Sequence, residues 1–249
     1  MGSSKIVVYT AITGNLDNLI EPQYVSENCD YLCFTDNLKV TSKTWVVKQL
    51  PFMQADVVRR SKKPKILPHL FLEDYDISIW IDGNFKIRGN IAELAEEVLS
   101  VHNMALFRHP DNRESVYEEA EACIRLKKDK PYIIKQQVEK YRLEGLPAKS
   151  IQMNGVIFRR HNDISIINAM EHWWQEICDN SRRDQLSFAY IAWKNNLSYY
   201  VIDENGIDNK WFKKERHRLS LNEHLNKKYR KLKKSLIAKG YNVFKQSKR

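Results

Sequence analysis

Short apolar runs alternate with amphipathic segments along most of the chain. Runs rich in β-branched and aromatic residues predict strands, and apolar residues spaced three or four apart predict helices. The predicted strands cover residues 5–10, 31–34, 45–50, 77–81, 104–107 and 152–160. The predicted helices cover residues 61–73, 90–100, 114–143 with a break near Pro131, 163–179 and 185–194. Strands that alternate with helices predict an α/β domain around a mostly parallel sheet with both faces covered.

Neither an internal repeat nor a low-complexity linker interrupts this pattern before about residue 210. We therefore predict one Rossmann-like domain over residues 1–209 and a basic tail over residues 210–249. The tail holds 15 Lys/Arg and 2 Asp/Glu, whereas the whole 249-residue chain has a net charge of +10, so the body is close to neutral. Its apolar residues recur every three or four positions and predict a cationic amphipathic helix; they are Leu225, Tyr229, Leu232 and Leu236.

The charge of the tail favours an anionic partner, either a lipid surface or nucleic acid. The predicted helix could lie on the inner leaflet of a membrane, or pack on the domain with a solvated lysine face. No apolar run approaches the length of a membrane span, and the N-terminus does not resemble a signal peptide. We therefore expect a cytoplasmic protein that is at most peripheral to the inner face of the membrane. The four cysteines lack metal-ligand spacing and are expected to be buried free thiols.

Polar clusters follow several predicted strands. Ligands of open α/β sheets bind beyond the carboxyl ends of the strands, so these clusters are candidates for a common site. The clusters contain Thr10, Ala11, Thr13 and Gly14 after the first strand, Asp36 after the second, Asp82 after the fourth, and Arg108 with His109 after the fifth. Taken singly, each cluster could be an ordinary turn, and His109 could be a structural hydrogen-bonding group.

The triplet Asp82-Gly83-Asn84 directly follows an apolar strand. Side chains two residues apart can face the same way, so Asp82 and Asn84 could together hold a divalent cation, Mn²⁺ or Mg²⁺, that also binds a diphosphate. Because the triplet has one carboxylate, its metal affinity could be low or its metal dependence lost. Just upstream, residues 59–65 hold five cations at the start of a predicted helix, and we expect Arg60 and Lys65 to neutralise the diphosphate.

Asp184 is the candidate catalytic base. It lies between Arg183 and Gln185 at a predicted helix start, where the helix dipole and Arg183 would keep it ionised and able to take a proton from an acceptor hydroxyl. In that role the transfer would invert the anomeric centre. The same position also suits an N-cap aspartate with a purely structural role. We expect Asp82 and Asp184 to share one pocket.

Together these motifs resemble a glycosyltransferase-like family formerly described as a domain of unknown function. Its plant members act in mucilage and wall polysaccharide synthesis, and its bacterial members lie among surface-polysaccharide genes. The resemblance covers roughly residues 5–195, and its motifs lie at residues 9–14, 34–36, 60–62 with 65–69, 80–85, 107–110, 154–155 and 183–185.

The resemblance implies a GT-A fold and the transfer of a hexose from a nucleotide-diphosphate sugar, with a UDP-linked donor expected, to a glycan or lipid-linked glycan acceptor. By position, Thr10, Thr13 and Asp36 would hold the nucleoside, and Asp82 and Asn84 the metal and diphosphate. Asn154 and Gly155 would lie beside the donor or acceptor sugar, and Arg108 and His109 beside the acceptor. Two rivals stay open: a nucleic-acid-binding protein acting through its tail, which the near-neutral body disfavours, and a catalytically silent GT-A scaffold.

Overall fold

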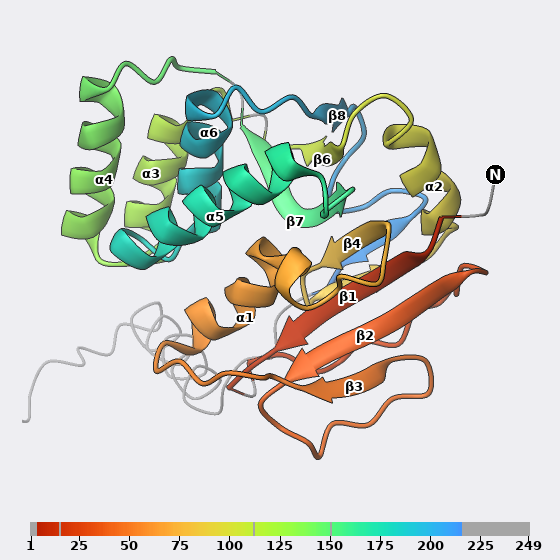
Figure 1. Ribbon diagram of the computed structural model, residues 1–249. Helices are drawn as coiled ribbons and strands as arrows, with labels where there is room; N and C mark the ends of the chain where they lie inside the picture. Colours follow the sequence, from red (N-terminus) through yellow and green to blue (C-terminus); the bar gives the residue numbers. More distant parts are fainter. Residues whose placement is uncertain (1–3, 15, 112, 150, 216–249) are drawn as a thin grey trace, which may run out of the picture. The chain divides into compact units, whose positions relative to one another are not determined.

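The computed structural model describes residues 4–14, 16–111, 113–149 and 151–215. Within them, seven strands form one sheet in the order β3-β2-β1-β4-β7-β6-β8 (Figure 1). All its neighbouring strands run parallel except the two pairs that involve β7, which is antiparallel to both β4 and β6. The α/β class and the mostly parallel sheet are therefore confirmed. The strand bounds are Ile6–Ile12 (β1), Cys29–Thr35 (β2), Val46–Gln49 (β3), Ile77–Ile81 (β4), Met104–Arg108 (β6), Gln152–Arg159 (β7) and Tyr200–Ile202 (β8).

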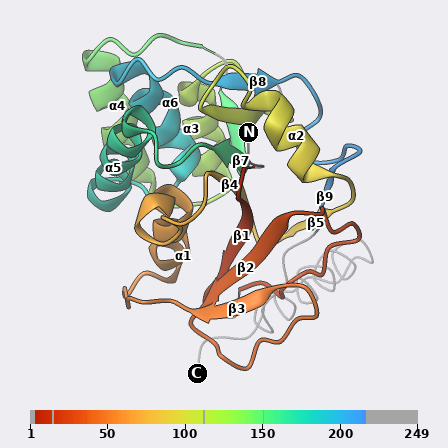
Figure 2. The same ribbon diagram turned by 45° about the vertical axis from the view of Figure 1, so that its right-hand side comes forward.

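Helices cover both faces of this sheet (Figures 1 and 2). One face packs against α1 (Val57–Ile66), α3 (Val116–Arg125), α4 (Pro131–Leu143), α5 (Ile164–Asp179) and α6 (Asp184–Lys194). The other packs against α2 (Ile91–Val98) and a two-stranded ribbon of β5 (Phe85–Ile87) and β9 (Phe212–Lys214). In β1, Val7 and Tyr9 belong to the first core and Val8 to the second. Because both faces are buried, the central strands read as continuous apolar runs.

The first helix begins earlier than its apolar spacing predicts. Asp56 caps its N-terminus by accepting hydrogen bonds from the backbone N–H groups of Val58 and Arg59. Pro64 lies in the last turn, and the helix ends before Pro68, which opens a short 3₁₀ turn over Pro68–Leu70. The prediction of one helix over residues 61–73 is therefore wrong in its bounds. As a result, the basic cluster lies along the body of α1 rather than at its start.

Residues 210–215 still belong to the folded body, because β9 pairs with β5. Residues 216–249, which carry the predicted amphipathic helix, lie outside the described residues. In the part of the chain that is described, no helix combines the length and the apolar character that a membrane crossing requires. All four cysteines are free thiols, as expected, but only Cys33 and Cys123 are buried, and Cys178 is exposed.

Candidate functional site

The predicted site residues lie along one edge of the sheet, where its parallel strands end. The parallel strands β1, β2, β4 and β6 end at this edge, and β7 begins there because it runs the opposite way. Asp36, Asp82 and His109 therefore follow strands that end at this edge, and Asn154 lies near the start of β7. Strand ends at such an edge are where open α/β sheets bind their ligands.

Lys65 joins the two carboxylates that the sequence singles out. Its Nζ lies 2.9 Å from Asp82 Oδ1 and 2.7 Å from Asp184 Oδ2. The second oxygen of Asp184, Oδ1, lies 2.8 Å from Lys62 Nζ. Asp82 and Asp184, which are far apart in sequence, thus belong to one charged cluster, which we call the lysine cluster: Lys62, Lys65, Asp82 and Asp184.

The lysine cluster is largely removed from water. The side chain of Lys65 is 2% exposed and that of Asp184 is 7% exposed, whereas that of Asp82 is 38% exposed. Burying charges is costly unless they are paired, and here each of the two lysines faces a carboxylate. Asp82 is therefore the member through which a ligand in solvent would reach the others.

The packing around Lys65 fixes its position. Its backbone carbonyl accepts hydrogen bonds from Arg159 Nη2 at 2.6 Å and from the Tyr9 hydroxyl at 3.3 Å. Arg159 and Tyr9 are fully buried. The ammonium group lies 5.4 Å from the ring centroid of Trp80, whose indole N–H donates to Asp82 Oδ1 at 2.8 Å. Lys65 is thus held at both its backbone and its charged end.

Burial and ion pairing shift the pKa values of these groups in opposite directions. Burial alone would raise the pKa of Asp184, but Lys62, Lys65 and Arg183 outweigh it and hold this pKa far below its usual range. Burial would lower the pKa of Lys65, but Asp184 and Asp82 outweigh it and raise the pKa. For Lys62, burial dominates, and its pKa falls to about 8. Asp184 and Lys65 are therefore charged at neutral pH, and Lys62 begins to lose its proton just above it.

Asp36 forms a second group of contacts at this edge, at the end of β2. Its carboxylate accepts from the Gly14 backbone N–H at 3.1 Å and from Arg60 Nη1 at 2.5 Å. Gly14 has φ +60°, and a Cβ there would come within 3.1 Å of Val57, so the turn requires glycine. The Thr13 hydroxyl donates to the Val57 carbonyl at 2.7 Å. These contacts lock the loop after β1 onto α1.

Some residues predicted to bind the donor have other contacts or positions than we expected. Arg60 pairs with Asp36 and with the Gln54 carbonyl, at 2.8 Å from Nε, rather than with Asp82 or Asp184. Thr10 and Ala11 lie within β1 and are buried, because the strand extends to Ile12. The Thr10 hydroxyl has no hydrogen-bond partner. Lys62, which sequence reasoning did not single out, takes the place expected for Arg60; its spacing of three residues from Lys65 was the available signal.

A bulge in β7 brings Asn154 and Gly155 to the site. Leu106 of β6 pairs with Ile157, but the next residue, Phe107, pairs with Met153, so residues 154–156 have no partner on β6. The Gly155 carbonyl accepts from the Asp82 backbone N–H at 2.8 Å. A Cβ on Gly155 would come within 2.9 Å of the Phe85 ring, so only glycine allows this close approach.

The Asn154 side chain is 4% exposed, yet neither its amide oxygen nor its nitrogen has a hydrogen-bond partner. A buried amide without partners costs free energy, and native proteins usually satisfy such groups with protein, water or a ligand. Its neighbour Gly155 contacts Asp82 through the backbone. Asn154 is therefore a candidate for a ligand hydrogen bond, in line with its predicted place beside a sugar.

The Asp82-Gly83-Asn84 triplet does not offer a divalent cation an open set of ligands. Asp82 Oδ1 already accepts from both Lys65 and Trp80. Asn84 is buried, and its Nδ2 donates to the Glu215 carbonyl at 3.2 Å. The turn itself is tight, with Phe85 N donating to the Asp82 carbonyl. Among the described residues, no group of three or more His, Cys, Asp or Glu side chains could hold a metal ion. These contacts do not favour a metal centre built from protein side chains alone.

Arg183, the N-cap residue of α6, adds a third cation to the neighbourhood. Burial opposes its charge, but Asp184, a hydrogen bond with Cys123 and, more weakly, Asp82 raise its pKa. Its Nε is buried without a hydrogen-bond partner. Asp184 is the first residue of α6 rather than its cap, so the capping role that would explain it structurally does not apply.

The predicted acceptor residues Arg108 and His109 follow β6. Arg108 pairs with Asp203 at the surface. His109 is buried, accepts from the Asp111 backbone N–H at 3.1 Å, and lies beside Arg113, which in turn pairs with Glu119. Burial, reinforced by Arg113, lowers the pKa of His109 to about 4, so it is neutral at physiological pH. These contacts give His109 a structural role in holding the loop after β6.

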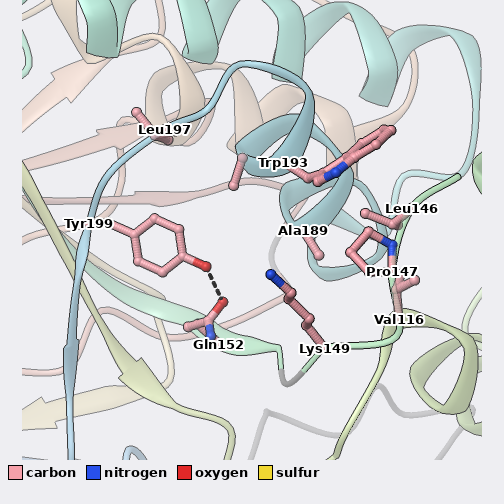
Figure 3. Close-up of a pocket in the computed structure, with 10 residues that line it drawn as sticks. Val116, Leu146, Pro147, Lys149, Gln152, Ala189, Trp193, Leu197 and Tyr199 are labelled. Carbon is pink, nitrogen blue, oxygen red and sulfur yellow. Dashed lines mark hydrogen bonds between the residues drawn. The ribbon is translucent and has the colours of Figure 1, made fainter.

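A cavity of about 180 Å³ opens beside α6 (Figure 3). Lys149 extends its amino group into it, and the Tyr199 hydroxyl donates to Gln152 Oε1 at 2.8 Å. Gln185, the neighbour of Asp184, donates to the Gln152 carbonyl at 3.1 Å. This hydrogen bond links the part of the cavity lined by Gln152 to the lysine cluster. Trp193 is 38% exposed. The lining includes Leu146, Lys149, Gln152, Ala189, Trp193 and Tyr199.

Comparison with known proteins gives one positive result. The family model described as "TOD1/MUCI70, glycosyltransferase-like domain" matches residues 37–224, which is more than half of the chain. The comparison with curated proteins found no match. The matched region includes the lysine cluster, Asn154, Gly155 and Arg183, whereas Thr10 and Thr13 precede it.

Proposed function

Because the chain belongs to the TOD1/MUCI70 family of glycosyltransferase-like domains, we propose that it transfers a hexose from a nucleotide-diphosphate sugar to a saccharide acceptor. The observation that carries this proposal is the position of Lys65, whose ammonium group contacts both Asp82 and Asp184 at the ligand-binding edge of the sheet. The donor we expect is UDP-linked, and the acceptor a glycan or lipid-linked glycan of surface polysaccharide synthesis.

The diphosphate is the leaving group of this reaction, and negative charge builds up on it as the bond to the sugar breaks. Lys65 supplies fixed positive charge at Asp82, the most exposed member of the cluster, and Lys62 and Arg183 add positive charge near Asp184. Charge placed in advance in a site that excludes water stabilises such a transition state more than charge in bulk solvent. The partnerless amide of Asn154 would bind the sugar next to it.

In this proposal Asp184 is the base. It removes the proton of the acceptor hydroxyl, the oxygen attacks the anomeric carbon, and the electron pair of the broken C–O bond leaves with the diphosphate, which inverts the anomeric centre. Without a nucleotide, both Asp184 oxygens contact lysine ammonium groups, which makes the carboxylate a weak base. A bound diphosphate brings negative charge to the same ammonium groups, so donor binding would raise the pKa of Asp184 toward the range that a base requires.

The acceptor would lie in the cavity beside α6. Trp193 and Tyr199 offer aromatic faces, and Lys149 and Gln152 offer polar groups, a combination suited to a sugar ring with apolar faces and a hydroxyl rim. Ala189 in its wall lies five residues beyond Asp184, which is about 8 Å along the helix axis. A saccharide bound in the cavity would have to extend over at least this distance to reach the base.

A screen of sugar nucleotides tests the proposal. Purified protein is incubated with UDP-, GDP-, ADP- and dTDP-sugars, with and without a panel of mono- and disaccharides, and nucleotide diphosphate release is measured. We expect release from one nucleotide class, faster with an acceptor, and its loss in Asp184→Asn but not in the exposed control Asp74→Asn. Tight binding of a sugar nucleotide without any turnover would instead support a silent scaffold.

The cavity has its own test. Trp193→Ala should raise the KM for the saccharide acceptor about threefold to tenfold, as expected for the loss of one aromatic contact. Donor hydrolysis without acceptor should stay unchanged. Tyr132→Ala, which removes another exposed aromatic residue on α4, is the matched control. Equal KM values for Trp193→Ala and wild type would place the acceptor elsewhere.

A further inference from the structure

The Asp82-Gly83-Asn84 motif predicts a divalent cation at Asp82. The ammonium group of Lys65 lies beside this position. Lys65 Nζ lies 2.9 Å from Asp82 Oδ1, and the Trp80 indole N–H occupies the same oxygen from 2.8 Å. The other predicted ligand, Asn84, uses its side-chain NH₂ to hold the Glu215 carbonyl. A metal ion at Asp82 would thus meet a carboxylate with one oxygen already engaged and a neighbouring positive charge.

Lys65 cannot easily turn away to make room for a metal ion. Its backbone carbonyl is held by Arg159 and Tyr9, and its side chain is almost fully buried. The ammonium group also bonds Asp184, so leaving the cluster would remove one of the two lysine partners of this buried carboxylate. Breaking a buried ion pair by removing one member is strongly unfavourable, because the remaining charge stays desolvated.

Together with Arg183, the lysine cluster has the charge balance of a metal site. Lys62 and Lys65 contact the carboxylates of Asp82 and Asp184, and the charge of Arg183 is added to theirs, which leaves one net positive charge. A divalent cation on a single carboxylate would leave the same net charge. The three protein cations come from α1 and from the start of α6, so two elements of the fold converge on the position of the diphosphate.

We propose that the ammonium group of Lys65 replaces the divalent cation at Asp82, so that the protein binds nucleotide diphosphates without metal through Lys65, Lys62 and Arg183. This inference rests on the proposed function. In it, the phosphate oxygens bind the three protein cations directly, and Asp82 orients Lys65 rather than ligating a metal. Lys65 is thus a donor-binding residue, and Asp82 and Trp80 are positioning residues.

Calorimetry on the full-length protein tests the inference. UDP and GDP are titrated at pH 7.5 in the presence of EDTA and, separately, of Mn²⁺ or Mg²⁺. The dissociation constant in EDTA should agree within about twofold with that in metal, a difference too small to represent a lost ligand. Binding that is at least about tenfold weaker in EDTA and is restored by Mn²⁺ would overturn the inference while leaving the proposed donor class intact. Absence of binding under all conditions would overturn both.

Variants of Lys65 provide a second readout that does not depend on turnover. Lys65→Met should weaken UDP binding in EDTA at least about tenfold, and Mn²⁺ should restore part of it because Asp82 Oδ1 loses its ammonium partner. Lys65→Arg keeps the charge and should still bind UDP without metal. Lys128→Met, at an exposed position, is the control. Circular dichroism verifies folding, and a folded Lys65→Met that binds UDP like wild type would contradict the inference.

Discussion

The arginines and the lysines of α1 have different kinds of partners. Arg59 bonds the Ile177 and Asn180 carbonyls at the end of α5, at 3.0 and 2.8 Å, and Arg60 bonds the Gln54 carbonyl. Each arginine also pairs with one carboxylate, Arg59 with Asp56 and Arg60 with Asp36. Lys62 and Lys65 contact carboxylates through their ammonium groups. All four residues lie within two turns of one helix, yet the arginines join parts of the fold and the lysines gather charge at the ligand edge.

This difference follows from the chemistry of the two side chains. The guanidinium group presents several N–H donors in a fixed plane, so it can bind two carbonyls at a helix end and a carboxylate at once. An ammonium group is a compact point charge with three rotatable donors, so it can bind a phosphate oxygen beside a carboxylate. We infer that the arginines contribute stability and the lysines contribute ligand binding, and three changes can separate these contributions.

Removing the carboxylate that the two lysines share should have the largest effect. Asp184→Asn should lower the rate of sugar transfer about 10²- to 10⁴-fold, the range for loss of a general base. Lys65 keeps Asp82 as a partner and so keeps its charge, whereas Lys62 loses the carboxylate that raises its pKa. Nucleotide diphosphate affinity should therefore be largely retained. Single-turnover kinetics and calorimetry measure the two quantities separately. A transfer rate near that of wild type would show that Asp184 is not the base.

Removing an arginine should act on stability instead. Arg59→Met should lower the free energy of unfolding by about 1–3 kcal/mol, because two carbonyls at the end of α5 and Asp56 lose their charged donor. Nucleotide affinity should stay within about twofold of wild type. Urea denaturation gives the stability, with Lys63→Met as a control on the same helix. If Arg59→Met weakened binding without lowering stability, the division between the two kinds of residue would fail.

The ionisation of Lys62 should give the smallest effect. Burial lowers its pKa to about 8, so its ammonium group is present below that pH and is lost as the pH rises through it. The kcat/KM for the donor, which reports the free enzyme, should therefore fall above about pH 8, by up to about tenfold per unit. Lys62→Arg should shift this decline to higher pH, since arginine stays protonated. An unchanged pH profile in Lys62→Arg would assign the decline to another group.

The sheet could be predicted from sequence largely because its strands are buried on both faces. The five-residue apolar run of β4 is long enough to be recognised, and its predicted bounds match those observed. The strands β5, β8 and β9 have three residues each and depend on partners that are distant in the chain, so local pattern does not reveal them. The bounds of α1 were missed because Asp56, its cap, lies outside the apolar pattern used to find the helix.

The candidate site could be predicted only in part. Residues that directly end a strand, such as Asp82, were found because strand ends mark the ligand edge. Lys62 and the bulge at residues 154–156 were not, because each depends on how one element is placed against another. The buried Arg159, which holds the backbone of Lys65, reads in sequence as one more basic residue at the end of a strand.

By itself, the sequence determined the α/β class, the mostly parallel sheet and the edge at which polar residues gather, because these follow from local burial patterns and strand direction. Tertiary structure alone decided which cation meets which carboxylate. Lys62 and Asp184 are brought together by α1 and α6, which pack on the same face of the sheet. The rotation of α1 about its axis then sends Arg60 toward Asp36 and Lys65 toward Asp82, and no local pattern encodes that rotation.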